Sequence, residues 1–186
     1  MQRLDNFMLP QGFRGRSGVW CQLWWLVQAC LFSTSPQFMY GWRRLILRFF
    51  GANIGQFVII RPSVRITYPW KLDIGDYAWV GDNVELYSLG QIKIGAHAVV
   101  SQRSYICTGS HDIKSRDFKI FSKPVIIEDG AWLGTDVFVA PGVTVGRNAV
   151  IGARSSVFAD AKAGFVHFGT PAKPVRERVF DEPGVM

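Results

Sequence analysis

The chain has 186 residues, of which 48% are hydrophobic and 19% are charged. This balance is typical of one packed domain with a sizeable core, and it excludes an intrinsically disordered chain. The formal net charge of +7 favours an acidic partner, such as an anionic membrane surface or a phosphate-bearing cofactor, whereas no basic helix or stacking-sheet motif supports nucleic acid.

The first 50 residues are rich in aromatic and basic side chains. We predict one helix around residues 19–32 and another around residues 37–50, with Pro36 at the break. The apolar run 19–32 is too short to span a bilayer, which needs about 20 residues. Two roles stay open for residues 1–50: a cap on the following domain, or an amphipathic segment at a membrane surface. The side chains that suit a membrane surface are Trp20, Trp24, Trp25, Phe32, Arg14, Arg16, Arg43, Arg44 and Arg48.

Cysteine usage and the N-terminal residues indicate a compartment. Three cysteines without Cys-x-x-Cys spacing do not resemble a secreted disulfide framework, so we expect a reducing environment. The N-terminus lacks the basic-then-apolar pattern of a signal peptide. We therefore expect a cytoplasmic protein, peripheral at the inner face of the membrane if residues 1–50 dock there.

From Ile54 onward an aliphatic residue recurs every six positions, and the run from Ile127 to Val157 is unbroken. A helix has a period of 3.6 and a strand a period of 2, so a period of six reflects the architecture. Three hexads make one triangular coil of parallel β structure. The triplets of hexads begin at Ile54, Ile74, Ile94, Ile127 and Val145. This spacing predicts an all-β domain of about five coils over residues 51–160.

The interval between triplet starts jumps from 20 to 33 residues after Ile94. The jump predicts that residues 107–126 are ejected as a loop, and long loops in compact repeat domains are commonly functional. Both open ends of a repeat domain need covering, because unpaired strand edges attract other chains. We expect residues 161–186 to cover the last coil.

Six motifs add to the hexads. They are LRFFGANIG at 47–55, TGSHD at 108–112, AWLG at 131–134, APGVTVG at 140–146, VIGARSSV at 150–157 and GTPAKPVRER at 169–178. Together they resemble the hexapeptide-repeat acyltransferases, in particular the colanic acid biosynthesis type of acetyltransferase, which is related to the galactoside, maltose and nodulation-factor enzymes. The resemblance covers residues 54–178. It implies a left-handed parallel β-helix, a homotrimer, and acetyl-CoA bound in a groove between neighbouring β-helices, without a metal.

Acyl transfer to a hydroxyl needs a base for the alcohol proton, and histidine suits that task because its pKa lies near neutrality. The resemblance implies that His111, on the ejected loop, is the general base. Asp112 or Asp117 would orient its ring, as the carboxylate does in a catalytic triad. We expect His97 to be a surface residue and His167 to pack within the C-terminal cap.

The resemblance also assigns residues to the cofactor. Trp132, Thr135 and Ala153 match positions that line the pantetheine groove. Lys173 and Arg176 stand where the family uses basic residues for the adenosine phosphates, a charge pairing that phosphate favours.

The acceptor side departs from the galactoside and maltose pattern. The position of the acceptor-binding Asn in those enzymes is Gly81 here, and Asp82 and Asn83 follow it. Asp82 and Asn83 are candidates for binding sugar hydroxyls, although corner residues of a β-helix have the same composition. The identity of the acceptor stays open.

The sequence therefore predicts an acetyl-CoA-dependent O-acetyltransferase that acts on a sugar or lipid-linked oligosaccharide in surface polysaccharide biosynthesis. The acetyl group would pass directly from acetyl-CoA to the acceptor hydroxyl. The alternative route, in which Cys107 first takes the acetyl group as an acyl-enzyme, is disfavoured. The alternatives are a xenobiotic (antibiotic) acetyltransferase of the same fold and a noncatalytic β-helix that serves binding or assembly. A zinc enzyme like the γ-class carbonic anhydrases would need three His ligands around the metal. The chain has three His in total and no close pair among them, so this alternative is disfavoured.

Overall fold

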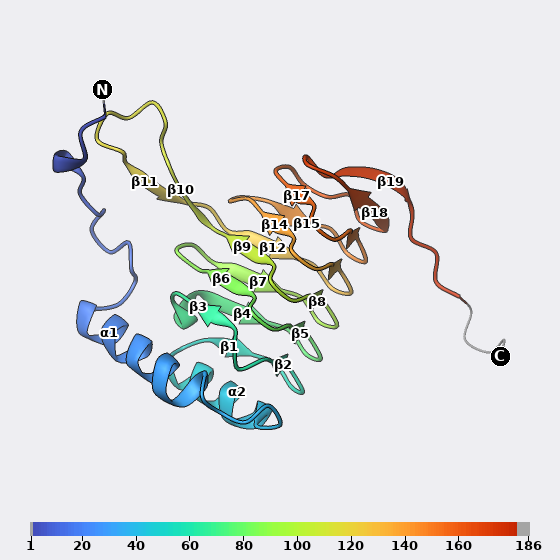
Figure 1. Ribbon diagram of the computed structural model, residues 1–186, viewed down its shortest axis with the longest axis horizontal. Coiled ribbons are helices and arrows are strands. Elements are labelled where there is room, and N and C mark those ends of the chain that lie inside the picture. Colours follow the sequence, from blue (N-terminus) through green and yellow to red (C-terminus); the bar gives the residue numbers. More distant parts are fainter. Residues whose placement is uncertain (1, 182–186) are drawn as a thin grey trace.

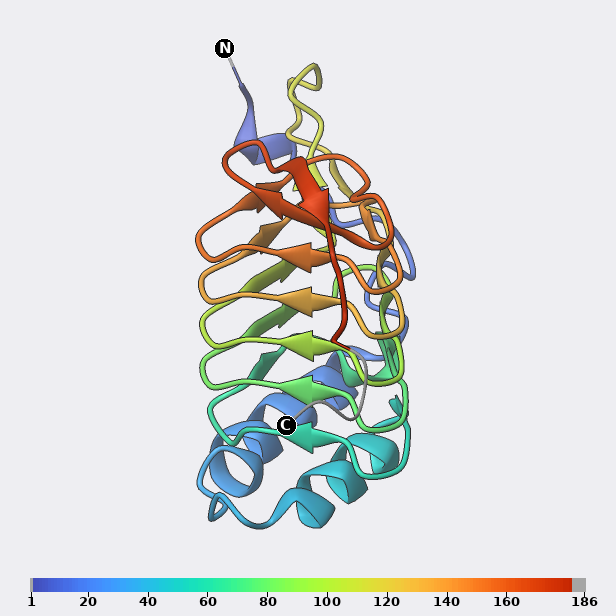
Figure 2. The same cartoon turned by 90° about the vertical axis from the view of Figure 1, so that its right-hand side faces the viewer.

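The computed structural model describes residues 2–181; residue 1 and residues 182–186, the end of the predicted C-terminal tail, lie outside the described residues. Short strands wind into a parallel β-helix whose three faces are sheets A, B and C (Figures 1 and 2). Each hexad supplies one short strand and one corner, and three hexads return the chain to the starting face. The parallel β-helix predicted from the six-residue period is confirmed.

The strands of the three sheets are stacked in chain order, one from each coil. Sheet A contains β1 (Asn53–Ile54), β4 (Leu72–Ile74), β7 (Ile92–Ile94), β12 (Val125–Ile127) and β15 (Thr144–Val145). Sheet B contains β2 (Ile59–Ile60), β5 (Trp79–Val80), β8 (Val99–Val100), β13 (Trp132–Leu133), β16 (Val150–Ile151) and β18 (Phe165–Phe168), with β19 (Lys173–Glu177) antiparallel to β18. Sheet C contains β3 (Arg65–Ile66), β6 (Glu85–Tyr87), β9 (Tyr105–Cys107), β14 (Phe138–Val139) and β17 (Ser156–Val157).

The aliphatic residue of each hexad stacks on its equivalent in the next coil. On sheet B, Val100 pairs with Val80 and Leu133, and Leu133 pairs with Ile151. All four side chains are fully buried. Because burying a Val, Leu or Ile side chain stabilises the fold by about 1.5–3 kcal/mol, these columns form the main core.

The β-helix has about six turns, one more than the five predicted. Ala161 forms a bridge with Val145 in sheet A, and β18 then pairs with β16 in sheet B. The sixth turn escapes the pattern because Ala161 follows Val157 by four residues, and because the position that pairs with Ile151 is held by His167 instead of an aliphatic residue. Both Ala161 and His167 are nevertheless buried, as hexad positions are.

Two helices lie across the open end of the first coil (Figure 1). α1 spans Gly18–Val27 and continues into a π-helical turn, η2 (Gln28–Phe32), while α2 spans Tyr40–Phe49. Among the described residues, no helix has both the length and the apolar composition needed to cross a membrane. α1 begins after Ser17, whose hydroxyl accepts a hydrogen bond from the Trp20 N–H at 3.3 Å.

Arg43 of α2 is fully buried against the first coil. Its Nε donates to the carbonyl of Ile60, at 2.7 Å, on the free edge of sheet B. Its terminal nitrogens donate to the Ser35 hydroxyl and to the carbonyls of Pro36 and Gln37, between 2.6 and 2.9 Å. The guanidinium therefore joins the first coil to the loop that connects the two helices.

Other side chains of the helices satisfy the remaining edge of the first coil. The donors are Arg48 to the Ile54 carbonyl (2.7 Å), Arg44 to the Val58 carbonyl (2.9 Å) and Trp24 Nε1 to the Ile66 carbonyl (2.9 Å). Backbone groups buried without a partner are costly, so these contacts replace the coil that is missing on this side. The side chains of Arg43, Arg44, Arg48 and Trp24, which by composition suit a membrane surface, therefore contact the first coil and form part of its cap.

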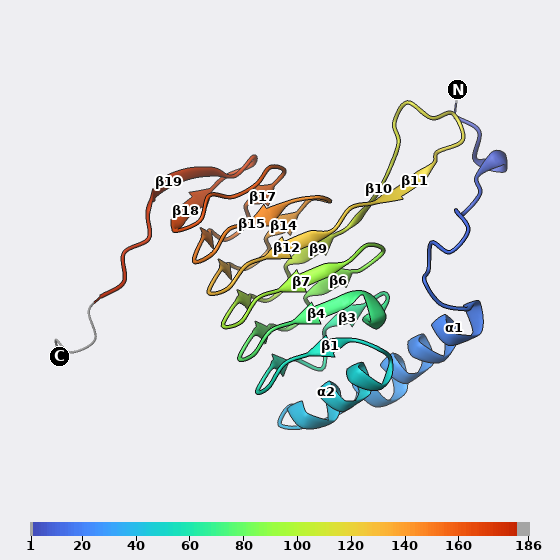
Figure 3. The same ribbon diagram turned by 180° about the vertical axis from the view of Figure 1, so that it is seen from behind.

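Residues 2–17 form a separate N-terminal strap rather than part of a helical cap. The strap contains one 3₁₀ turn, η1 (Leu4–Asn6), and passes beside the β-helix from α1 toward a projecting hairpin (Figures 1 and 3). Trp70, in the 3₁₀ turn η3 (Pro69–Lys71), donates from Nε1 to the Arg14 carbonyl at 2.7 Å. Lys71 donates to the Phe13 carbonyl, also at 2.7 Å. The strap is therefore anchored to the corner between sheets C and A.

Arg43→Met should leave the carbonyls of Ile60, Pro36 and Gln37 without their charged donor. Because a buried polar group left unsatisfied costs about 1–3 kcal/mol, we expect the free energy of unfolding to fall by about 3 kcal/mol or more. Urea denaturation measures the change. Arg16→Met removes an exposed Arg near α1 and should shift stability by less than about 0.5 kcal/mol. Equal losses in the two variants would contradict the capping role.

Candidate active site

A β-hairpin carries the predicted base away from the β-helix. β10 (Gly109–His111) pairs antiparallel with β11 (Ile120–Ser122), and His111 lies opposite Ile120. The hairpin follows β9 of sheet C and precedes β12 of sheet A, so it projects from the corner between these sheets (Figure 3). It lies within the segment 107–126 for which the repeat spacing predicts an ejected loop.

Phe118 holds the imidazole of His111 through two contacts. Nδ1 lies 2.7 Å from the Phe118 carbonyl oxygen, and the two rings stack with centroids 3.7 Å apart and planes 11° apart. A carbonyl oxygen only accepts hydrogen bonds, so Nδ1 carries a hydrogen and donates it. The neutral ring then keeps its lone pair on Nε2. A general base needs that lone pair.

The structure gives the orienting contact on His111 to this carbonyl rather than to a carboxylate. The Asp112 carboxylate turns back on its own loop and accepts a hydrogen bond from the Lys114 N–H at 2.9 Å. Such an Asx turn ties the side chain to the backbone of its own loop. Within residues 2–181, no hydrogen bond joins the His111 ring to Asp112 or Asp117.

His111 lines an open pocket of about 590 Å³ on the hairpin. The other lining residues are Asp112, Ile113, Lys119, Ile120, Phe121 and Lys123. The N-terminal strap reaches the same hairpin: the Phe7 ring lies 6.0 Å from the His111 ring, and the Arg3 N–H donates to the Arg116 carbonyl at 2.7 Å. No spacing or motif in the sequence links Phe7 to His111, so sequence reasoning misses this neighbour.

A second feature, the sheet B groove, has a volume of about 640 Å³ and extends from the corner after β8 to β18 and the tail. Four of the five residues predicted to bind the cofactor line it: Trp132, Thr135, Ala153 and Arg176. The fifth, Lys173, is exposed on β19 and is not part of the lining. The repeat explains this grouping, because Trp132 stands on a strand of sheet B and Thr135 and Ala153 occupy its corner in successive coils.

The walls of the sheet B groove are apolar at the strands and cationic at the tail. Val150, Val166 and Phe168 line it beside Trp132. Trp132 is fixed by a hydrogen bond from Nε1 to the Ser101 hydroxyl, at 3.0 Å. An extended molecule with an apolar arm and an anionic end fits such walls.

Arg178 holds the tail in place, a role that sequence reasoning misses. Its guanidinium donates to the carbonyls of Gly130 (2.9 Å) and Asn148 (3.3 Å), on corners of two successive coils. The Arg176 side chain has no hydrogen bond or ion pair with any residue that the structure describes. The two arginines therefore differ: Arg178 is an anchor, and Arg176 is free to meet a ligand.

Asp82 and Asn83, predicted to bind the acceptor, line a third pocket of about 590 Å³. This pocket shares Ser101 and Gln102 with the sheet B groove, so the two form one continuous depression along the corner between sheets B and C.

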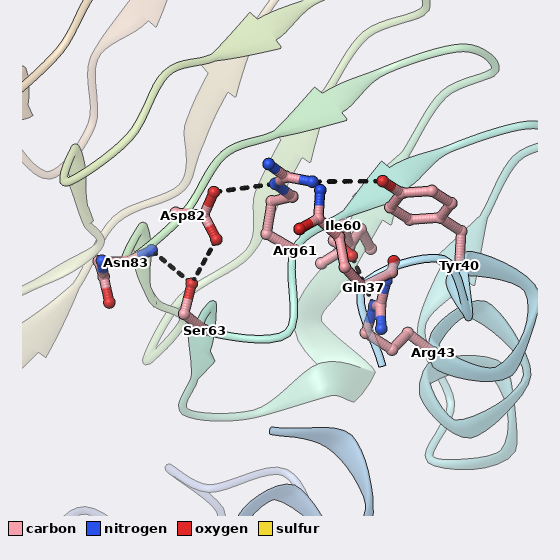
Figure 4. A network of polar contacts seen from close by, with 8 residues as sticks. All are labelled: Gln37, Tyr40, Arg43, Ile60, Arg61, Ser63, Asp82 and Asn83. Carbon is pink, nitrogen blue, oxygen red and sulfur yellow. Dashed lines mark hydrogen bonds and ion pairs between the residues drawn. The ribbon is translucent and has the colours of Figure 1, made fainter. Parts of the chain in front are cut away.

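Asp82 belongs to a chain of polar contacts that reaches the cap (Figure 4). Its carboxylate accepts hydrogen bonds from Arg61 Nε and the Ser63 hydroxyl, both at 2.9 Å. Arg61 also donates to the Tyr40 hydroxyl of α2 at 3.3 Å, and the Asn83 N–H donates to the Ser63 oxygen at 3.0 Å. Both oxygens of Asp82 are thus engaged in bracing the first two coils.

The two other histidines have contacts of different kinds. His97 stands at a corner and stacks on Tyr77, with centroids 5.0 Å apart. His167 is buried, and its Nε2 accepts a hydrogen bond from the Lys162 N–H at 3.1 Å. Burial lowers the pKa of His167, which favours its neutral form. Across residues 2–181, no three His, Cys, Asp or Glu side chains are grouped to hold a metal ion.

The pocket of His111 and the sheet B groove lie on opposite sides of one chain. In a prism of three sheets, sheet B is the face opposite the corner between C and A. Figures 1 and 3 show β10 and β11 on one side and β18 and β19 on the other. The two pockets share no lining residue. A single chain therefore does not bring the base and the groove together.

The comparisons with known proteins identify the family. Residues 124–159 match the model of the bacterial transferase hexapeptide (six repeats). The chain is 59% identical over 182 residues to the putative colanic acid biosynthesis acetyltransferase WcaF of Escherichia coli (strain K12), covering 98% of this chain and 100% of that protein. The chain belongs to the hexapeptide-repeat acetyltransferases. It is therefore an acyltransferase, as the six motifs predict.

Solved structures share the fold over most of their length. A maltose O-acetyltransferase from Clostridium difficile 630 is 25% identical with a TM-score of 0.79, over 88% of this chain and 90% of that one. The hexapeptide-repeat acetyltransferase VCA0836 from Vibrio cholerae O1 biovar eltor, solved in complex with acetyl coenzyme A, is 24% identical with a TM-score of 0.80, over 89% and 92%.

Proposed function

We propose that this acetyltransferase transfers the acetyl group of acetyl-CoA to a hydroxyl of a sugar or oligosaccharide during biosynthesis of a surface polysaccharide. The observation that carries the proposal is the geometry of His111, whose Nδ1 is fixed on a carbonyl so that Nε2 is the basic atom. Two similar proteins, a putative colanic acid biosynthesis acetyltransferase and a maltose O-acetyltransferase, support a saccharide acceptor.

The sheet B groove is the proposed site for acetyl-CoA. Its apolar wall at Trp132 and Phe168 suits the pantetheine arm, and the unpaired guanidinium of Arg176 suits a phosphate. The Vibrio cholerae neighbour was solved with acetyl coenzyme A, which shows that this fold accommodates that molecule.

The proposed reaction moves one proton and one acetyl group. His111 Nε2 takes the proton of the acceptor hydroxyl while its oxygen attacks the thioester carbonyl. The Nδ1 hydrogen bond to the Phe118 carbonyl stabilises the ring as it becomes charged. When the tetrahedral intermediate breaks the carbon–sulfur bond, the imidazolium returns the proton to the leaving thiolate, and the O-acetylated sugar remains.

Cys107 does not fit an acyl-enzyme route. Its thiol is buried and donates to the Gly109 carbonyl at 3.1 Å. Burial raises the pKa of Cys107 above the usual value of a thiol, so the nucleophilic thiolate is disfavoured. Direct transfer needs no such nucleophile.

The proposal includes a homotrimer in which the hairpin of one subunit covers the sheet B groove of its neighbour. The separation of His111 from the groove within one chain supports this arrangement, because each half of the site then finds its complement on another copy. The hairpin and sheet B are different surfaces, so their contact is heterologous, and three such contacts close a ring.

His111→Ala should lower the release of free thiol from acetyl-CoA, in the presence of a saccharide acceptor, by about 10²–10⁴-fold, because that is the contribution of a general base. The acceptor is chosen from a panel of sugars, nucleotide-sugars and lipid-linked oligosaccharides. His97→Ala changes a histidine outside both pockets and should keep wild-type turnover. A His111→Ala enzyme that retains more than about a tenth of the activity would refute the assignment.

Arg176→Ala should raise the KM for acetyl-CoA about tenfold, the loss expected for one charge-assisted hydrogen bond, and leave the KM for the acceptor unchanged. Lys173→Ala removes a cation from the same strand but outside the groove, and should change the KM for acetyl-CoA by less than about twofold. Equal effects of the two substitutions would show that the groove does not hold the phosphates.

A further inference from the structure

The outer face of the two helices carries a set of large apolar side chains that stay partly exposed. Val19, Leu23 and Leu26 follow one stripe of α1, and Trp42, Leu45 and Phe49 follow one stripe of α2. These six side chains are between 37% and 81% exposed. A soluble helix normally pairs a buried apolar face with a polar one, so two apolar outer stripes mark an interaction surface.

Both stripes differ from the helix faces that contact the β-helix. The inner faces contact the first coil, through Trp24 of α1 and Arg43 of α2. The helices lie beside each other across one end of the molecule, joined by a hydrogen bond from Trp42 Nε1 to the Leu31 carbonyl at 3.1 Å (Figure 1). The outer stripes therefore form one broad end face, which we call the helix layer.

The charge of the protein is concentrated at this end. Residues 6–72, which include both helices and the first coil, contain eight Arg or Lys and no Asp or Glu. The rest of the chain holds thirteen basic and fourteen acidic residues, so the whole net charge of +7 comes from residues 6–72. Arg14 and Arg16, just before α1, are exposed.

We propose that the helix layer docks on the surface of an anionic lipid bilayer. Exposed aliphatic and aromatic side chains suit the boundary between headgroups and acyl chains, and the exposed Arg14 and Arg16 beside α1, in a segment that contributes no carboxylate of its own, suit anionic phosphates. A second copy packed end to end would bring two cationic regions together, which charge repulsion opposes.

This docking is independent of the transferase reaction, because the helix layer shares no residue with the pocket of His111 or with the sheet B groove. It would hold the enzyme beside acceptors that are carried on lipids. The His111 hairpin and the sheet B groove both lie outside the docked face, so neither pocket is covered by the bilayer.

The test is sedimentation of the full-length protein with vesicles of phosphatidylcholine mixed with phosphatidylglycerol, compared with vesicles of phosphatidylcholine alone. We expect binding to the mixed vesicles, weakened by high salt, and little binding to the neutral ones. Leu26→Asp combined with Leu45→Asp should reduce binding at least about tenfold, since it places two charges in the contact. Both leucines point to solvent, so the thermal midpoint should stay near that of the wild type.

The matched control is Tyr77→Asp combined with Phe158→Asp, which adds the same two charges at exposed aromatic residues outside the helix layer. It should bind vesicles like the wild type. No binding of wild-type protein to the mixed vesicles, or equal loss in the control, would overturn the proposal. A larger assembly in solution that only the Leu26/Leu45 variant loses, without vesicle binding, would assign the face to a second copy. Failure of the thiol-release assay would leave the vesicle result unaffected.

Discussion

The free edge of the first coil is the constraint on which the rest of the structure depends. Every later coil finds its backbone partners on the coil before it, whereas the first coil has none on its outer side. Arg43 and its neighbours on the two helices supply those partners, and Trp24 closes the end of the aliphatic columns. Once this edge is satisfied, each added coil repeats the same pairing and extends the same core. The arginines of α2 are at this end of the protein because the carbonyl oxygens of the first coil need hydrogen-bond donors.

The stacking of coils also decides where chemistry can occur. Corners repeat at fixed positions, so Thr135 and Ala153 come into line above one another beside a row of outward side chains on sheet B. The hairpin leaves from the opposite corner, where the chain departs from the period, and there Phe118 fixes the ring of His111. One chain therefore carries the two proposed halves of the site on opposite sides. The proposed repetition of the subunit around a closed ring would join them.

The sequence predicts the fold well, because a period of six has one structural meaning. It also groups four of the five residues predicted to bind the cofactor, since the position of a residue in its hexad fixes the face or corner on which it lies. The sequence does not predict contacts that depend on the tertiary path of the chain. The hydrogen bond of His111 goes to a backbone carbonyl, that of Phe118, which any residue could supply. The contact of Phe7 with His111 joins distant residues that no motif or regular spacing connects. No pattern in the sequence separates Lys173 from Arg176, because a bulge in β19 places both of them opposite residues that line the groove, Phe168 and Val166. The sixth turn is missed because Ala161 comes only four residues after Val157 and because His167 takes the place of the next aliphatic residue.

The most direct test of the account is complementation between two inactive variants, His111→Ala and Ala153→Trp. The first lacks the base, and the second fills the sheet B groove at an exposed corner, so each alone should be inactive. If the hairpin of one subunit serves the groove of the next, equal mixtures assembled together should recover about one quarter of wild-type thiol release, because one contact in four joins two intact halves. Mixtures that stay as inactive as the separate variants would contradict a site shared between subunits.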